Sequence, residues 1–306
     1  MKILHTADWH LGQTFYEYDR REEHFHFLEW LKQQIKQHEI DVLLIAGDVF
    51  DSPNPSAESQ RVYYRFLREV TSENPSLQIV IIAGNHDSAA RLEAPNPLLE
   101  DMNIIVRGTV RRNAEGDIDL QHFIVPLYTE GKVTAYCLAV PYLRQGDYPS
   151  AENYSKGVQQ LYEQLFNKVK EKGIPVVAMG HLQATGSEIS EDDRSERTVI
   201  GGLECVSPDA FNEAITYTAL GHLHRSQRVS HRENVRYSGT PMPMSFAEKN
   251  NASGVVMITI DTEGTNIEKL EFQPLAGLVS IPPEARPLEE VLQVIGELPD
   301  GDVTLR

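Results

Sequence analysis

The stretch KILHTADWHLG, residues 2–12, decides the fold because an apolar run ends there in a polar cluster. Residues 2–7 have the character of a buried β-strand, and Asp8 and His10 follow at its end. In an extended chain, side chains two positions apart point to the same side, so we expect this carboxylate and this imidazole to face one ligand. The chain therefore begins with a strand that delivers polar side chains at its carboxyl end.

The rest of the first hundred residues alternates between helix and strand patterns. The apolar spacing predicts a helix over 20–37, a buried strand over 41–46, a helix over 56–70 with Ser56 as N-cap, and a strand over 78–83. This order predicts a sheet of parallel neighbours with helices on its faces.

The later part of the chain is richer in strands. We predict strands over 133–140, 176–179 and 215–220, a helix over 154–172, and antiparallel hairpins over 227–237 and 254–272. The fold class is therefore α/β, a two-sheet mixed β-sandwich flanked by helices. A proline-rich stretch over 281–287 predicts a linker, and one further helix begins at Leu288.

Composition limits the classes of function. With 306 residues and 41% hydrophobic residues, the chain can form one large domain with a small appendage. No apolar run approaches the length of a membrane span, no signal peptide is evident, and two cysteines suit a reducing cytoplasm. The net charge of −17 argues against a dedicated nucleic-acid binder, so a DNA substrate would need a local basic patch, metal ions or a partner protein.

Five polar clusters each follow an apolar strand. They are Asp8-Trp9-His10, Gly47-Asp48, Gly84-Asn85-His86-Asp87, Gly180-His181 and Gly221-His222-Leu223-His224. Open α/β sheets bind ligands at the carboxyl ends of their strands, so the five clusters can converge. Carboxylate, imidazole and amide oxygen together suit a divalent ion such as Mn²⁺, and the absence of cysteine argues against structural zinc. Taken alone, most of these clusters are common in loops, and Gly-Asn-His-Asp after a strand is rarer; the prediction rests on all five in this order.

This set of motifs resembles the calcineurin-like metallophosphoesterase superfamily. The family pattern is Asp-x-His, Gly-Asp-x-x-Asp, Gly-Asn-His-Asp, Gly-His and Gly-His-x-His, and every part is present. Within the family, residues 2–12 and 46–51 are most similar to bacterial DNA-repair nuclease subunits. The resemblance covers residues 1–275, which we take as the nuclease domain. It implies that 276–306 form a linker and the beginning of a C-terminal cap domain, so we expect a shortened form of a longer chain, with a naturally short form as the alternative.

The resemblance also implies a site with two Mn²⁺ ions, with Mg²⁺ as the alternative. The first metal would be held by Asp8, His10 and His224, the second by Asn85, His181 and His222, with Asp48 bridging both. His86 would face the scissile phosphate, and Asp51 would accept a hydrogen bond from His86 and orient it.

The implied activity is 3′–5′ exonuclease action on duplex DNA ends, with endonuclease action on hairpins or single strands. An ATPase partner subunit and a homodimer are implied as well. For the dimer we expect helices near 56–70 and 91–102, with apolar surface from Val62, Phe66, Leu92, Leu98 and Leu99; the alternative is that these residues pack against their own sheet. Arg20, Arg21 and Arg91 lie near the motif loops and are candidate phosphate contacts, with solvated helix positions as the alternative.

Two other functions compete with a DNA nuclease. One is a phosphoesterase acting on phosphoproteins or small phosphodiesters, which is disfavoured because Ser52-Pro53 follows Asp51 where protein phosphatases usually have Arg-Gly. The other is a non-catalytic scaffold, which is disfavoured because all seven ligand positions are retained.

Overall fold

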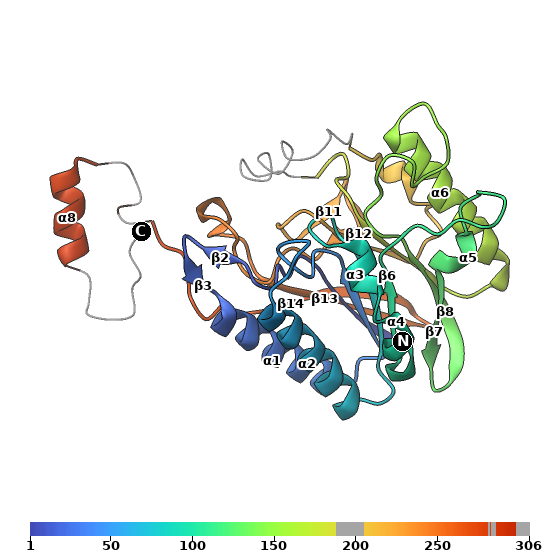
Figure 1. The fold of residues 1–306 in the computed structure, drawn as a ribbon, viewed down its shortest axis with the longest axis horizontal. Helices are drawn as coiled ribbons and strands as arrows, with labels where there is room; N and C mark the ends of the chain where they lie inside the picture. The colour runs from blue at the N-terminus through green and yellow to red at the C-terminus, as the bar shows by residue number, and fades with distance from the viewer. Residues whose placement is uncertain (188–204, 281, 283–285, 298–306) are drawn as a thin grey trace.

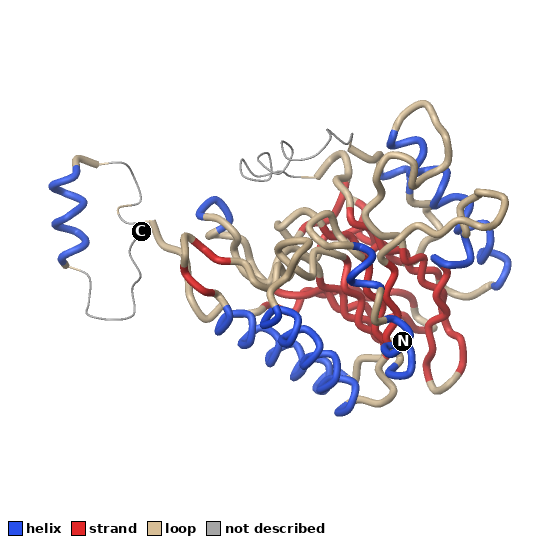
Figure 2. Tube along the Cα trace, in the orientation of Figure 1, coloured by secondary structure: helices blue, strands red, loops and turns tan. Residues whose placement is uncertain are grey.

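The protein is an α/β sandwich of two six-stranded sheets, seen here in a computed structural model that describes residues 1–187, 205–280, 282 and 286–297. The strand orders are β14-β13-β1-β4-β5-β6 and β11-β12-β10-β9-β8-β7. The strands lie together at the centre, and the longer helices lie outside them (Figures 1 and 2). The prediction of a two-sheet mixed sandwich flanked by helices is confirmed.

The first sheet is built on a parallel core. Its parallel strands are β1 (Lys2–Thr6), β4 (Val42–Ala46), β5 (Gln78–Ile82) and β6 (Ile104–Arg107). The predicted hairpin is confirmed as β13 (Gly254–Asp261) and β14 (Gly264–Glu271), and β13 pairs antiparallel with β1. Helices α1 (Arg21–His38) and α2 (Ala57–Glu73) pack against this sheet.

The second sheet also has a parallel core of four strands, but it carries one antiparallel strand at each edge. Its parallel strands are β8 (Lys132–Ala139), β9 (Val176–His181), β10 (Tyr217–Gly221) and β12 (Arg232–Tyr237). The edge strands β7 (Ile124–Thr129) and β11 (Gln227–Val229) pair antiparallel with β8 and β12. Helix α6 (Tyr154–Val169) covers the outer face.

Shorter elements complete the chain. They are β2 (Thr14–Phe15), β3 (Tyr18–Asp19), α3 (Ala89–Glu93), α4 (Asn96–Leu99), α5 (Leu120–Phe123), α8 (Leu288–Gly296), and the 3₁₀ turns η1 (Glu100–Met102), η2 (Lys170–Lys172), η3 (Pro208–Ala210) and η4 (Phe246–Glu248).

The alternation of side chains along β4 explains the layers. Leu43 and Ile45 point outward and join the core beneath α1 and α2, whereas Val42, Leu44 and Ala46 point inward and join the core between the two sheets. All five residues are buried, so the strand is a continuous apolar run, as expected for a parallel strand covered on both faces.

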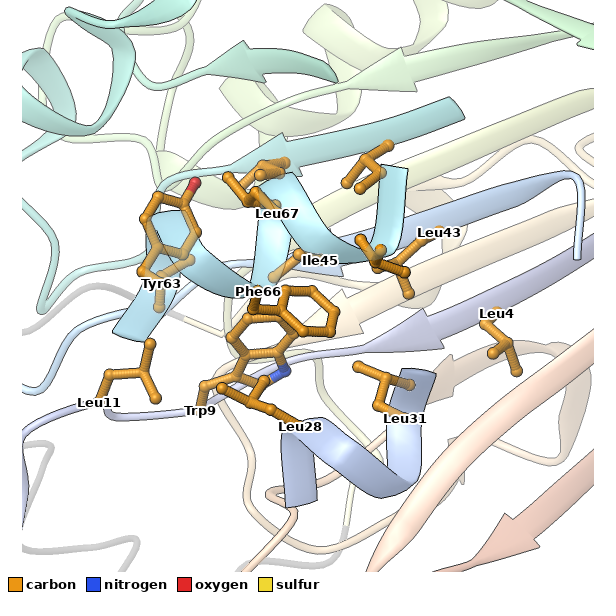
Figure 3. Packing of buried hydrophobic residues seen from close by; sticks show 14 of the residues in the cluster. Leu4, Trp9, Leu11, Leu28, Leu31, Leu43, Ile45, Tyr63, Phe66 and Leu67 are labelled. Atoms are coloured by element: carbon orange, nitrogen blue, oxygen red, sulfur yellow. The ribbon is translucent and has the colours of Figure 1, made fainter. Parts of the chain in front are cut away.

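Trp9 anchors the first motif loop in the outer core. Its indole lies between α1 and α2, where the ring centroids of Trp9 and Phe66 are 5.4 Å apart (Figure 3). The indole Nε1 donates to Thr6 Oγ1 at 2.9 Å, and the Trp9 carbonyl lies 3.1 Å from His24 Nε2. The loop is therefore fixed from behind, which leaves Asp8 and His10 on the opposite side.

Most predicted elements are confirmed, including the Ser56 N-cap, whose side chain accepts a hydrogen bond from the Ser59 N–H. Two edge strands were missed. β6 has only four residues, and β7 contains Pro126, which normally argues against a strand but is tolerated at a sheet edge.

The apolar surface predicted for a homodimer is not there. Val62, Phe66, Leu92 and Leu99 are at most 6% exposed and belong to the core beneath α1 and α2. Of the five residues, Leu98 alone is exposed, at 76%. The prediction that these residues supply a dimer surface is therefore wrong for four of them, because they pack against their own sheet.

The C-terminal part agrees with the sequence pattern where it is described. Helix α8 begins at Leu288, as predicted, and stands apart from both sheets (Figure 1). The predicted linker over 281–287 lies partly outside the described residues. Among the described residues, no helix has both the length and the apolar character needed to cross a membrane.

Candidate metal centre

All five motif loops follow the carboxyl ends of neighbouring strands: β1, β4, β5, β9 and β10. Backbone hydrogen bonds tie the first two loops together, since the Asp8 N–H donates to Gly47 O and the His10 N–H donates to Asp48 O, each at 3.0 Å. The clusters therefore converge at one end of the sandwich, as the sheet topology predicts.

The backbone of the site is strained rather than extended. Asp8, His10, Asp48 and His222 have positive φ angles of 54°, 45°, 49° and 100°. Asp8 and His10 do face one place, since they have potential ligand atoms within 4.8 Å of each other, but the expected cause, an extended chain, is wrong. A non-glycine residue in this conformation costs about 1–2 kcal/mol, and such strain clusters at functional sites.

Glycine is required where these loops approach one another. A Cβ on Gly84 would collide with the backbone N and the carboxylate of Asp48. A Cβ on Gly47 would collide with the His181 ring. The two glycines thus permit contacts between β4, β5 and β9 that no larger residue would allow.

Asp48 lies at the middle of the cluster. Its Oδ2 is 3.2 Å from His181 Nε2 and 3.8 Å from His10 Nε2. The Asn85 amide oxygen lies 3.0 Å from both His181 Nε2 and His222 Nδ1. On the other side, Asp8, His10 and His224 have potential ligand atoms within 4.8 Å of one another.

These side chains fit divalent cations. His10 Nε2 is buried and has no hydrogen-bond partner among the described residues. His181 Nδ1 donates to the Ala46 carbonyl at 2.8 Å, so Nε2 is the ring atom that faces Asp48 and Asn85 and would bind a cation. Oxygen and imidazole ligands without thiolate suit Mn²⁺ and related ions.

Burial and mutual charge shift the pKa values of the cluster. Burial opposes ionisation of Asp48, but the charge of His181 prevails and holds the Asp48 pKa well below its usual value. Burial also opposes the charge on His181, yet Asp48 raises the His181 pKa to about 9. Burial and the nearby His181 lower the His222 pKa to about 3. Bound cations would balance the negative charge of the buried carboxylates, which include Asp8 and Asp48.

His86 lies at the edge of the cluster, where it is half-buried. Its backbone N–H donates to Asp48 Oδ1 at 2.9 Å, and its ring Nδ1 lies 3.0 Å from the backbone carbonyl of Asp51. The contact expected between His86 and Asp51 therefore exists, but through the carbonyl. The Asp51 carboxylate instead lies 3.3 Å from His10 Nδ1.

The three candidate arginines behave differently. Arg20 is 2% exposed, pairs with Glu23 at 2.8 Å and donates to the Pro243 carbonyl at 2.7 Å. The prediction of a phosphate contact is wrong for Arg20, because its guanidinium is buried and already satisfied. Arg21 and Arg91 are exposed; the first pairs with Asp19, and the second hydrogen-bonds to the loop at Pro53 and Asn54.

Two carboxylates at the site were missed by the sequence analysis. Glu248 is 3% exposed, and its Oε1 lies 2.9 Å from His224 Nδ1. Asp87 accepts hydrogen bonds from the N–H groups of Gly84, Val49 and Phe50, and burial followed by repulsion from Asp48 raises its pKa to about 6. Asp87 stands inside a quoted motif and could have been assigned a loop-fixing role. Nothing in the sequence links Glu248 to His224.

A sixth strand end also reaches the site. The Tyr142 N–H donates to Ala83 O at 2.9 Å, and its ring centroid is 6.2 Å from that of His181. The Arg144 guanidinium lies over the Tyr142 ring at 5.6 Å. Tyr142 follows β8 just as the other clusters follow their strands, and this position was the available signal.

The fold, the strand-end loops and the histidine–carboxylate cluster define a metallophosphoesterase. The model of the calcineurin-like phosphoesterase family matches residues 1–226, and the chain belongs to this family.

Within the family, the chain belongs with the SbcD subunits of the SbcCD nuclease. It is 38% identical to the SbcD nuclease subunit of Rhodobacter capsulatus over 97% of this chain and 76% of that protein. It is 32% identical to the SbcD nuclease subunit of Escherichia coli over 91% of this chain and 70% of that protein. These similarities place the chain among the SbcD nuclease subunits.

Proposed function

We propose that this protein hydrolyses DNA phosphodiester bonds with two Mn²⁺ ions, as a 3′–5′ exonuclease on duplex ends and an endonuclease on hairpins or single strands. The observation that carries the proposal is the convergence of carboxylate, imidazole and amide ligands around Asp48, with His86 at the edge of the cluster.

The contacts support the proposed ligand roles. Asp8, His10 and His224 form one group, and Asn85, His181 and His222 form the other. Asp48 lies between the groups and would contact both ions. When bound, a metal pair supplies charge neutralisation for the phosphate and a hydroxide nucleophile near neutral pH.

His86 is the candidate for proton transfer. The Asp51 carbonyl accepts a hydrogen bond from His86 Nδ1, which leaves Nε2 as the ring atom that can contact the substrate. A protonated Nε2 would stabilise the developing charge on the phosphate or protonate the departing 3′ oxygen. The Asp51 carbonyl fixes the direction of the ring, so Asp51 acts as a positioning residue.

The partners follow from the family and the surface. SbcD subunits work with an SbcC-type ATPase, and we propose such a partner here, in the cytoplasm, together with a homodimer and a C-terminal cap that begins after residue 275. Arg21 and Arg91 are the exposed arginines proposed to contact DNA phosphates. A chain with a net charge of −17 would bind DNA weakly on its own, because a polyanion is attracted only by local positive charge.

The test is digestion of end-labelled duplex, hairpin and single-stranded DNA with Mn²⁺, with Mg²⁺ and with EDTA. We expect shortening from 3′ ends and cleavage at hairpin loops with Mn²⁺, and no products with EDTA. Asp48→Asn should abolish both reactions, because this carboxylate lies between both ligand groups. Substantial turnover by Asp48→Asn at millimolar Mn²⁺ would refute the assignment of Asp48.

A further inference from the structure

A cluster of aromatic rings stands beside the metal centre without a role in it. Phe15 and Tyr16 belong to the short hairpin of β2 and β3, and Phe246 belongs to η4. The ring centroids are 4.9 Å apart for Phe15 and Tyr16, 5.5 Å for Phe15 and Phe246, and 6.0 Å for Tyr16 and Phe246. We call these three rings the aromatic platform.

The platform is tied to the ligands of the first metal. Phe246 stands two residues before Glu248, whose carboxylate contacts His224. On the other side, the hairpin begins at Thr14, four residues after His10. The platform is therefore an extension of the two loops that carry His10 and His224.

Buried Arg20 fastens the two halves of the platform together. Its guanidinium lies 5.5 Å from the Phe15 ring centroid and donates to the Pro243 carbonyl at 2.7 Å. It also donates to Gln13 at 2.9 Å. The hairpin is thus held against the segment that leads to Phe246, which accounts for a buried arginine next to the site.

The hairpin presents Tyr16 to solvent at a conformational cost. Tyr16 is 60% exposed, and both Tyr16 and Glu17 have left-handed φ angles, 46° and 68°. Tight hairpin turns with this geometry favour Asn and Gly, so a tyrosine here is unfavourable for the turn itself. A ring that served only to hold the hairpin would be buried; the Tyr16 ring contacts Phe15 and Phe246 and remains accessible.

We propose that the aromatic platform stacks an unpaired base of the DNA strand that enters the metal centre. Every base offers a π-face to an aromatic ring, so such a surface accepts any sequence. The charge on the turn favours bases over backbone, because Glu17 stands exposed beside Tyr16, whereas Arg21, the proposed phosphate contact, lies beyond β3 and pairs with Asp19. Negative charge at this position repels phosphates, and the bases are the uncharged part of the strand.

The proposal rests on the proposed DNA nuclease function and gives it a substrate requirement. The strand near the first metal must be unpaired by at least one nucleotide, as in a hairpin loop, a frayed end or a single strand. Duplex DNA would have to open at this point before its bases reach the platform.

The test is a binding measurement that does not depend on cleavage. In an Asp48→Asn background, fluorescence anisotropy compares a labelled thymidine 12-mer with an abasic 12-mer of the same charge. We expect the thymidine strand to bind about tenfold tighter, which corresponds to about 1.4 kcal/mol. Tyr16→Ala should remove most of that preference and leave the affinity for the abasic strand unchanged, and Tyr16→Phe should keep the preference.

Tyr128→Ala is the matched control, because Tyr128 is an exposed tyrosine on the edge strand β7 of the other sheet. It should change neither affinity. The proposal is overturned if Tyr16→Ala keeps the preference for bases or weakens both strands equally. It is also overturned if Tyr16→Ala leaves DNA binding intact and abolishes binding of the ATPase subunit. Failure of the proposed nuclease function would show separately, as absent hydrolysis of DNA and of bis-p-nitrophenyl phosphate by the wild-type protein.

Discussion

Replacing Glu248 with glutamine should weaken the first metal position without unfolding the protein. The carboxylate of Glu248 accepts two hydrogen bonds, one from His224 Nδ1 at 2.9 Å and one from the Met244 N–H at 2.8 Å. Glutamine has the same shape but only one accepting oxygen, and its amide nitrogen is a donor. The glutamine oxygen can therefore accept from one of the two donors, and its amide N–H₂ must face the other.

Either orientation of the glutamine harms the site. If the amide nitrogen faces His224, it favours the tautomer with the proton on Nε2, which cannot bind a cation through that atom. If it faces Met244, the half-buried Met244 N–H loses its partner, and we expect η4 to shift. Changing a residue that orients a metal-binding histidine typically costs 10- to 100-fold in metal affinity, or about 1.4–2.7 kcal/mol.

Isothermal titration calorimetry of the metal-free protein with Mn²⁺ measures this directly. We expect two sites in the wild type, and in Glu248→Gln a dissociation constant that is 10- to 100-fold larger at one of them. Glu233→Gln is the matched control, because Glu233 is an exposed glutamate that pairs with Arg228 and Arg236. Two wild-type affinities in Glu248→Gln would refute the assignment of His224 as a ligand positioned by Glu248.

Other substitutions test the rest of the site and the core. His86→Ala should lower turnover about 10²- to 10⁴-fold and leave the calorimetric metal stoichiometry at the wild-type value, since the ring is assigned to proton transfer; a lost metal site would make it a ligand instead. Arg21→Ala and Arg91→Ala should each reduce the slope of log affinity against log salt by about one, and an unchanged slope in both would exclude these arginines from the DNA interface. Burial lowers the His5 pKa from 6.5 to about 3, so the unfolded state binds a proton first and stability is lost as pH falls from about 6.5 towards 3, by about 1.4 kcal/mol per pH unit. Urea unfolding of His5→Gln across this range should show a shallower loss than the wild type, and an identical loss would contradict the neutral, buried histidine.

The fold was predictable because buried strands and helices leave local patterns of apolar residues in the sequence. β1, β4 and β5 are covered on both faces, so each is an apolar run, and α1 shows helical spacing of the residues that it buries. The prediction of the dimer surface was wrong for a related reason. An apolar residue on a helix, such as Phe66, suits a partner and its own sheet equally well, and only the position of the helix decides between them.

The candidate site was predictable in its residues but not in its geometry. Motif spacing indicated which side chains follow the strands, and the sheet topology brought those strand ends together. The outcome for Arg20 could not be predicted in the same way. Its exposure depends on Pro243, more than two hundred residues away, and no local pattern encodes that contact.

The spacing of residues in the sequence could not predict the backbone conformation of the ligand loops, because that conformation is strained. A glycine precedes both Asp48 and His222, yet these two candidate ligands, with Asp8 and His10, carry left-handed φ angles themselves. Hydrogen bonds that cross between loops offset the cost: the His222 N–H donates to the Asp8 carboxylate at 3.0 Å, and the Thr240 hydroxyl donates to the Asp8 carbonyl at 2.9 Å. Each net hydrogen bond contributes about 1 kcal/mol, similar to the strain at one such residue. The ligands are thus held in place by contacts between segments up to 232 residues apart, and only the assembled fold contains that information.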